Sequence, residues 1–230
     1  DVPELLSVSL GSAETTLIQL TNAYSSFVNG GKKVKPIFID RIQNRRGKTI
    51  FNADKRKCLG CEEISYLKDD IPLIKDERKQ IISPETAYQI TSMMQGVVQR
   101  GTGRKLKNLN LNLAGKTGTT NKNTDTWFIG FTSDLVIGVY VGYDEPKSLG
   151  KFETGAKTAM PIFKSFIKAA LKKENTRPFK VPENITMMVV DSKTGKKVSF
   201  ASKKTLIESF KSNKVLEKTN ISKKINNRFN

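Results

Sequence analysis

The chain has 230 residues, of which 37% are hydrophobic, so it is long enough for one sizeable domain with a modest core. Its formal net charge of +18 is compatible with a polyanionic partner, such as nucleic acid, anionic lipid or an acidic wall polymer, and also with a compositional bias that carries no function. The sequence lacks histidine, which excludes a Ser-His-Asp triad, a Cys-His dyad and any His-ligated metal site. No apolar run reaches the roughly 18 residues of a transmembrane helix, and the chain opens at Asp1 as if cut from a longer protein.

The N-terminal region predicts an extended segment followed by a helix. Residues 5–12 are apolar and favour a short strand or extended approach that ends at Gly11. Thr15 or Thr16 can cap a helix that Gly30 and Gly31 terminate. Its apolar residues recur at helical spacing and predict a stripe in the core: Leu17, Leu20, Ala23, Tyr24, Phe27 and Val28.

Residues 34–52 predict a hairpin, with apolar residues on both arms and a turn at residues 44–47. Residues 53–80 are polar and irregular, and they contain Cys58 and Cys61. A single Cys-x-x-Cys is half of a zinc knuckle, and no second pair completes it. We interpret the pair as a local loop clip, oxidised or reduced.

A second helix is predicted to begin at Ser83, with Pro84 in its first turn and Glu85 near the positive end of its dipole. It ends at the Gly101-Thr102-Gly103 run, and residues 104–112 are expected to be a linker. Its predicted buried face consists of Ala87, Ile90, Met93, Met94, Val97 and Val98.

Two adjacent strands are predicted at residues 125–131 and 135–143, and the second is apolar enough to be buried on both faces. A helix with Pro161 in its first turn follows. Residues 185–200 predict a last hairpin, and residues 201–230 a basic, disordered tail with a weak helix near 204–216. The predicted apolar side of the helix consists of Ile162, Phe163, Phe166, Ile167, Ala170 and Leu171.

The stretch Ala114-Gly115-Lys116-Thr117-Gly118-Thr119-Thr120 lies between the second helix and these strands. On a sheet edge it would place one ammonium, two hydroxyls and a closely approachable backbone in one groove. Such a groove suits an acyl substrate that bears a carboxylate. A phosphate loop would need glycine where Asn110 stands, and a dinucleotide fingerprint would need glycine at Leu106. The basic residues also lack the patterning typical of nucleic-acid readers.

In context, this stretch resembles the Lys-Thr-Gly motif of serine acyl-transferases of the penicillin-binding class. The runs Ser9–Ser12, Ser83–Gly103, Ala114–Asn121, Asp125–Phe131 and Val139–Asp144 occur in the order found in class A, bifunctional penicillin-binding proteins of the 1A type. Residues 155–162 and 178–182 extend the resemblance, which covers roughly residues 3–200 with gaps at 53–80. The chain resembles the C-terminal part of their transpeptidase domain.

The resemblance implies a reaction and roles for four residues. A serine attacks the D-Ala-D-Ala bond of a peptidoglycan stem peptide, and an amine of a second stem peptide accepts the acyl group. A β-lactam mimics the donor. Lys116 would supply positive charge and proton-relay support, Thr117 and Thr119 would bind the substrate carboxylate, and the Thr119 N–H would be an oxyanion donor. Gly118 would let the substrate backbone lie close to the strand.

The sequence departs from the family pattern because it contains no Ser-x-Asn, and its Ser-x-x-Lys matches do not suit a nucleophile. Ser148/Lys151 and Ser165/Lys168 follow the Lys-Thr-Gly motif, which is the wrong order. Ser65/Lys68 lies in the polar insertion. We therefore expect the nucleophile upstream of Asp1, in a missing N-terminal part of the same protein, and we expect the isolated chain to be inactive.

The predicted fold is α/β (α+β): an antiparallel sheet with packed helices, in the serine β-lactamase and penicillin-binding-protein transpeptidase fold, incomplete on its N-terminal side. Residues 1–200 form the domain portion, with 53–80 as a polar insertion. Part of the sheet is expected to be exposed, which would make the chain aggregation-prone.

The resemblance implies stem peptides and β-lactams as partners, without nucleic acid, cofactor or metal. It also implies a location on the periplasmic face of the bacterial inner membrane, with an upstream anchor, and a parent protein that is also a glycosyltransferase. Two alternatives stay open: a degenerate fragment without catalysis, and a basic binding module for an anionic polymer or membrane.

Overall fold

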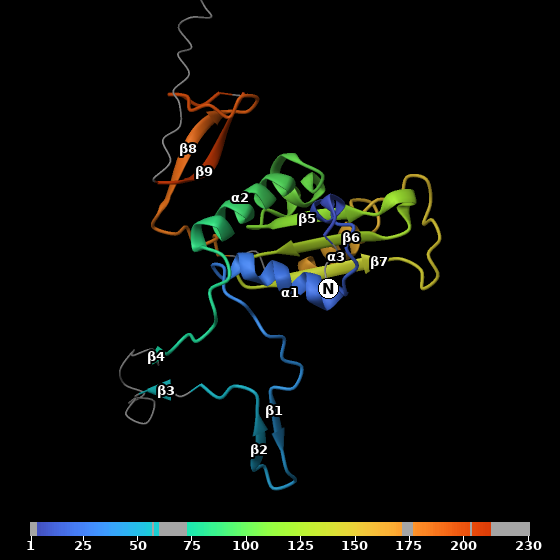
Figure 1. The fold of residues 1–230 in the computed structure, drawn as a ribbon, viewed down its shortest axis with the longest axis vertical. Helices are drawn as coiled ribbons and strands as arrows, with labels where there is room; N and C mark the ends of the chain where they lie inside the picture. The colour runs from blue at the N-terminus through green and yellow to red at the C-terminus, as the bar shows by residue number, and fades with distance from the viewer. Residues whose placement is uncertain (1–3, 57, 60–72, 172–176, 203, 213–230) are drawn as a thin grey trace, which may run out of the picture.

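The computed structural model describes residues 4–56, 58–59, 73–171, 177–202 and 204–212. Within these ranges the chain forms helices and antiparallel strands (Figure 1). The helices are α1 (Leu17–Val28), α2 (Pro84–Arg100) and α3 (Ala159–Ala170). The strands are β1 (Arg41–Gln43), β2 (Thr49–Asn52), β3 (Cys58–Leu59), β4 (Leu73–Ile74), β5 (Ala114–Thr119), β6 (Thr126–Phe131), β7 (Val136–Val141), β8 (Ile185–Asp191) and β9 (Thr205–Lys211).

The centre of the fold is a three-stranded antiparallel sheet in the order β5-β6-β7. Its two faces carry different helices (Figure 1). Leu17 and Thr21 of α1 lie against Gly138, beside Ile129, whereas Phe163 of α3 lies against Phe128 and Gly130. Because successive strand residues face opposite sides, α1 and α3 cover opposite faces of the sheet.

Burial within the sheet follows from this strand order. The central strand β6 is buried along almost its whole length, whereas β7 is mostly half-buried and Tyr140 is 40% exposed. The prediction that residues 135–143 are buried on both faces was therefore wrong. Within the described sheet β7 pairs only with β6, so its side chains receive less cover.

The core has two parts. One lies between α3, β6, the end of α2 and the segment after it, with these buried members: Val98, Leu106, Leu113, Phe128, Ala159, Met160, Phe163 and Ile167. The other lies between α2, β5 and β6, and α1 packs against it. Its buried members are Met94, Ala114, Phe131 and Phe179. Residues 104–112 were expected to be a linker, but they form a 3-10 helix at Arg104–Leu109 whose Leu106 is in the core.

The helix boundaries follow the local signals in the sequence. Thr16 caps α1 with a capping box that includes Gln19, and the Ser83 hydroxyl accepts the Thr86 N–H at the start of α2. The burial of the predicted apolar sides of the helices was predicted less well. Leu17 and Ala23 of α1 are exposed, and Phe166 of α3 is 54% exposed. Periodicity predicts an apolar side, but the packing partners decide how much of it is covered.

The hairpin predicted at 34–52 is confirmed as β1 and β2, although β1 begins only at Arg41. The strand predicted at 5–12 was wrong: Leu6–Leu10 is a 3-10 helix that ends at Gly11, whose φ of 88° suits glycine. The Cys58–Cys61 pair lies outside the described side chains.

The hairpin predicted at 185–200 is confirmed in part: β8 turns at residues 191–195, and the returning chain forms a bridge between Lys197 and Val190. The strand that pairs with β8 along its length is β9, which lies within the expected tail. This strand replaces the weak helix expected near 204–216. It packs on α2 through an ion pair between Arg100 and Glu208, and Gln89 donates to the Ser209 carbonyl. The remainder of the expected tail, from 213 onward, lies outside the described residues.

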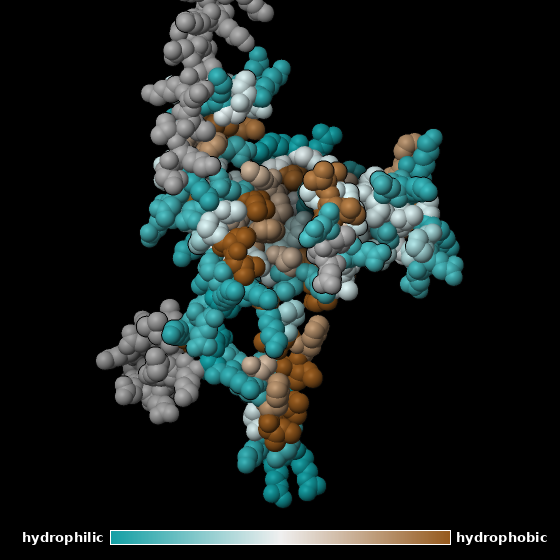
Figure 2. Space-filling view, viewed as in Figure 1, coloured by the Kyte–Doolittle hydropathy of each residue, from teal (hydrophilic) through white to brown (hydrophobic). Residues whose placement is uncertain are grey.

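Exposed apolar side chains gather in patches on the surface (Figure 2). One patch covers the β1–β2 hairpin and its approach, where Phe38 is 84% exposed, and another covers the N-terminal 3-10 helix, where Leu6 is 95% exposed. The expectation that part of the sheet would be exposed is confirmed only for its outer strands: β6 is buried, whereas β7 is mostly half-buried and the end of β5 is partly exposed. Among the described helices, none is both long and apolar enough to span a membrane.

Candidate active site

The Lys116–Thr119 stretch lies on β5, at an edge of the central sheet. β5 pairs with β6 in continuous register, from Ala114 opposite Phe131 to Thr119 opposite Thr126, and the Thr120 N–H bonds to the Asp125 carbonyl at 3.0 Å. Hydrogen-bonded residues alternate along an antiparallel pair, so the N–H groups of Thr117 and Thr119 point to the free edge. No described strand pairs with that edge, and an extended peptide can therefore add to it.

Lys116 is exposed, and its side chain folds back along this edge. Its ammonium donates to the Thr117 carbonyl oxygen at 2.7 Å. None of the ion pairs in the described part of the chain includes it. The edge thus presents a positive charge whose nearest partner is a neutral carbonyl.

Thr117 is half-buried and contacts Thr102, which was predicted only as part of the run that ends α2. Its Oγ1 lies 3.0 Å from the Oγ1 of Thr102, and either hydroxyl can donate. The flanking glycines make this contact possible, since a Cβ on Gly101 would lie 2.9 Å from the Val97 Cα. The chain therefore turns tightly at the end of α2 and brings Thr102 to β5.

Thr119 is exposed, and its Oγ1 accepts the Gly155 N–H at 3.1 Å. Gly155 lies in the turn before α3, far from β5 in sequence. A Cβ on Gly118, between the two threonines, would lie 3.1 Å from the Cβ of Trp127 on the neighbouring strand. Glycine therefore avoids a tight cross-strand contact and keeps this part of β5 free of a side chain.

The β5–β6 loop is held by side-chain hydrogen bonds. Thr120 Oγ1 lies 2.7 Å from Thr124 Oγ1 and accepts the Asp125 N–H, and the Tyr140 hydroxyl donates to Asp125 at 2.7 Å. This bond to a carboxylate raises the pKa of Tyr140. The Asn123 side chain donates to carbonyls of Gly150 and Lys151, so the loop is tied to the segment that leads to Gly155.

No nucleophile lies beside Lys116 in the part of the chain that the structure describes, since its ammonium has only the Thr117 carbonyl as a hydrogen-bond partner there. Ser148 is in an exposed loop, where its hydroxyl accepts the Gly150 N–H, and Ser165 is on the exposed side of α3. Ser65 lies outside the described residues. The described residues also contain no cluster of three acidic or cysteine side chains that could hold a metal ion.

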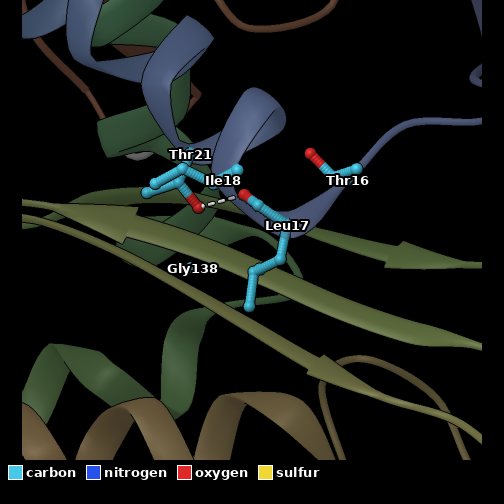
Figure 3. A pocket seen from close by; sticks show the side chains of 5 residues that line it. All are labelled: Thr16, Leu17, Ile18, Thr21 and Gly138. Carbon is cyan, nitrogen blue, oxygen red and sulfur yellow. Dashed lines mark hydrogen bonds between the residues drawn. The ribbon is translucent and has the colours of Figure 1, made fainter. Parts of the chain in front are cut away.

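A pocket of about 500 Å³ lies between the start of α1 and the middle of β7 (Figure 3). Its lining residues are Thr16, Leu17, Ile18, Thr21 and Gly138. The Thr21 hydroxyl donates to the Leu17 carbonyl within α1, and no lining residue is titratable. The pocket is therefore a packing feature between α1 and the sheet, separated from β5 by β6.

Comparison with known proteins gives a consistent result. A sequence profile described as the penicillin binding protein transpeptidase domain matches residues 3–168. Penicillin-binding protein 1A of Rickettsia felis is 45% identical over 215 residues, which covers 92% of this chain and 27% of the relative. Penicillin-binding protein 1A of Pseudomonas aeruginosa is 33% identical, covering 92% of this chain and 29% of the relative. The chain thus spans little more than a quarter of these relatives' length.

Solved structures support the same fold. A crystal structure of penicillin-binding protein 1A from Haemophilus influenzae covers 95% of this chain at a TM-score of 0.77 and 30% identity, and the match spans 35% of that protein's chain. The penicillin-binding protein PonA1 from Mycobacterium tuberculosis covers 78% of this chain at a TM-score of 0.60 and 24% identity. The predicted fold class, helices on an antiparallel sheet in a penicillin-binding transpeptidase arrangement, is confirmed.

Proposed function

Because the chain belongs to the penicillin-binding protein transpeptidase domain family, we propose that it is the C-terminal part of a peptidoglycan D,D-transpeptidase. The enzyme cross-links stem peptides through a serine acyl-enzyme and binds penicillin at the same site. The observation that carries this proposal is the free edge of β5, which presents the Lys116 ammonium and the outward N–H groups of Thr117 and Thr119 beside a glycine.

The edge accounts for how a D-Ala-terminated peptide would bind. The substrate lies along β5 as an added strand, and the missing Cβ of Gly118 allows close approach. The hydroxyls of Thr117 and Thr119 donate to the terminal carboxylate, and the Lys116 ammonium adds a charge of opposite sign. Charge-assisted hydrogen bonds of this kind are stronger than those between neutral groups.

The same edge accounts for transition-state stabilisation. As the serine attacks, negative charge develops on the scissile carbonyl oxygen, and an outward-pointing Thr119 N–H can donate to it. Lys116 supports proton transfer near the nucleophile. The serine and its own lysine come from sequence upstream of residue 1, so the acyl-enzyme forms only when that part is present.

Further properties of the whole protein are proposals on the same basis. Its relatives are longer proteins named penicillin-binding protein 1A, and the proposed peptidoglycan chemistry favours a periplasmic location and a membrane anchor upstream of this chain. A glycosyltransferase activity of the parent protein would also reside upstream. The β5 edge requires no cofactor for this chemistry.

A chimera tests the proposal. Residues 1–230 replace the matching segment of Rickettsia felis penicillin-binding protein 1A, which supplies the upstream region. Fluorescent penicillin should label the chimera covalently and leave the isolated 230-residue chain unlabelled. Labelling of the isolated chain at a serine would contradict the assignment of the nucleophile, and an unlabelled, folded chimera would contradict the function.

Two lysine variants locate the chemistry within the chimera. Lys116→Ala should lower the acylation rate by about 100-fold or more, the range of a residue that assists proton transfer. Lys168→Ala is the matched control, because Lys168 is exposed on α3 and belongs to a Ser-x-x-Lys pair that we regard as accidental. It should leave the rate unchanged. Equal losses in both variants would contradict the role of Lys116.

A further inference from the structure

Gly155 is buried against the face of β5 that lies towards α3, and several hydrogen bonds fix its position. Its carbonyl accepts the Met160 N–H at 2.8 Å, at the start of α3. Three residues further on, the Thr158 hydroxyl lies 2.6 Å from the Thr126 hydroxyl on β6. The turn that contains Gly155 is thereby attached both to the helix and to the sheet.

Only glycine fits at this position, because the backbone approaches the sheet so closely. A Cβ on Gly155 would lie 2.4 Å from the Trp127 carbonyl oxygen and 2.6 Å from the Gly118 carbonyl oxygen. Both atoms belong to backbone in a paired strand and cannot move aside as a flexible side chain could. This close approach brings the Gly155 N–H within hydrogen-bond distance of Thr119 Oγ1, at 3.1 Å.

This hydrogen bond sets the direction of the Thr119 hydroxyl. A hydroxyl has one proton to donate and two acceptor positions. The Gly155 N–H fills one acceptor position of Thr119, so Thr119 is the acceptor in this contact and retains its proton. Among the described residues no acceptor takes that proton, and Thr119 is exposed at the sheet edge. The contact between Thr117 and Thr102 differs, because either hydroxyl can donate there.

We propose that Gly155 is a positioning residue that fixes the Thr119 hydroxyl as a donor to the carboxylate of the substrate or β-lactam. This inference rests on the proposed function, since it assigns a carboxylate to the β5 edge. Gly155 does not touch the ligand. It acts through Thr119, by supplying the N–H that occupies the competing acceptor position and by holding β5 against α3.

The test uses the chimera with Rickettsia felis penicillin-binding protein 1A and two ligands, benzylpenicillin and its methyl ester, whose carboxylate is masked. Gly155→Ala should lower the acylation rate with benzylpenicillin by about tenfold, the effect of losing a hydrogen bond to a charged group. The rate with the ester should change by less than about twofold. Lys157→Ala, two residues away and exposed, is the control and should change neither rate.

A double variant distinguishes positioning from general damage. Thr119→Val removes the hydroxyl and should also impair benzylpenicillin selectively. Adding Gly155→Ala to it should cause no further loss, because both changes act through one hydroxyl. Equal losses with both ligands, or losses that multiply in the double variant, would overturn the proposal.

Amide hydrogen exchange in the 230-residue chain provides a readout that does not depend on activity. Exchange of the Gly155 amide should accelerate about tenfold or more in Thr119→Val and stay slow in Thr119→Ser, which keeps an acceptor. Unchanged exchange in Thr119→Val would overturn the proposal even if Gly155→Ala fails to fold. If the amide responds as expected and the folded chimera is not acylated by either ligand, the proposed function fails while the hydrogen bond stands.

Discussion

Phe163 and Phe166 of α3 offer a matched pair for testing how the sheet is held. They are three residues apart on one helix, but Phe163 is fully buried and Phe166 is 54% exposed. The Phe163 ring lies 4.8 Å from the Phe128 ring, at an angle of 58°, and a Cβ on Gly130 would lie 2.6 Å from it. Phe163 is therefore closely packed against the sheet, so its removal should leave a cavity.

Phe163→Ala should therefore lower the free energy of unfolding by about 3–5 kcal/mol, the sum of lost burial and cavity formation. Phe166→Ala should change it by about 0.5 kcal/mol, as is usual for a surface position. Urea unfolding of the 230-residue chain, followed by circular dichroism, measures both values. If the parent chain is only marginally stable, Phe163→Ala should be unfolded without urea while Phe166→Ala stays folded.

The outcome bears on the candidate site as well as on stability, because the first turn of α3 is hydrogen-bonded to Gly155, which contacts β5. In the chimera, Phe163→Leu, which retains most of the buried volume, should restore stability and acylation together. Similar destabilisation by Phe163→Ala and Phe166→Ala would refute the reasoning, since it would mean that α3 packs on the sheet through a different side.

Three further predictions concern single hydrogen bonds. Ser83→Ala should lower the free energy of unfolding by about 1 kcal/mol because it removes the cap of α2, whereas Ser83→Asp should retain the cap. Equal stability of the parent chain and both variants would contradict the cap. Thr102→Val should slow acylation of the chimera by about threefold to tenfold, because it removes the hydrogen bond to the Thr117 hydroxyl, whereas Thr102→Ser should leave the rate unchanged. A slower rate in both variants would contradict a role for the Thr102 hydroxyl. The hydrogen bond to Asp125 raises the pKa of Tyr140 above its ordinary value near 10. The bond therefore contributes stability below about pH 10, and this contribution is lost as the pH rises through the raised pKa. Tyr140→Phe should therefore flatten the loss of stability above about pH 10, measured by urea unfolding, and an unchanged slope would contradict the link.

The elements that sequence analysis predicted well are those with local causes. The caps at Thr16 and Ser83 involve residues within one helical turn, and the sequence contains all of the required atoms. The strands β5, β6 and β7 are joined by short turns, so their pairing requires no distant partner. Tertiary context changes little in such cases, and propensity and spacing are sufficient.

The elements that sequence analysis missed depend on distant contacts. β9 has no clear apolar alternation: Ser209 is buried and Ile207 is exposed. It forms a strand because it pairs with β8 and because Glu208 meets Arg100 on α2. Likewise, periodicity placed Phe163 and Phe166 on the same apolar side of α3, but only the position of the sheet decides that Phe163 is the buried one.

The candidate site shows the same division. The residue types of one consecutive stretch, together with the family resemblance, predict Lys116, Thr117, Gly118 and Thr119 as site residues. The contacts of Thr102 and Gly155 with this stretch were not predicted, since the two residues reach β5 from a helix end and from a later turn. The glycines around them were visible in the sequence, but a glycine indicates close approach without indicating what it approaches.

Under the proposed function, charge favours a carboxylate over a neutral ligand at this edge. The carboxylate of Asp125, in the loop that follows β5, accepts the Tyr140 hydroxyl, whereas no described acid pairs with Lys116. An incoming carboxylate therefore meets a positive charge that no described side chain has neutralised. At about 4 Å from the ammonium near a protein surface, the attraction is of the order of 4 kcal/mol before desolvation is subtracted. The hydroxyls and the outward N–H groups of β5 then determine orientation, which a point charge alone cannot do.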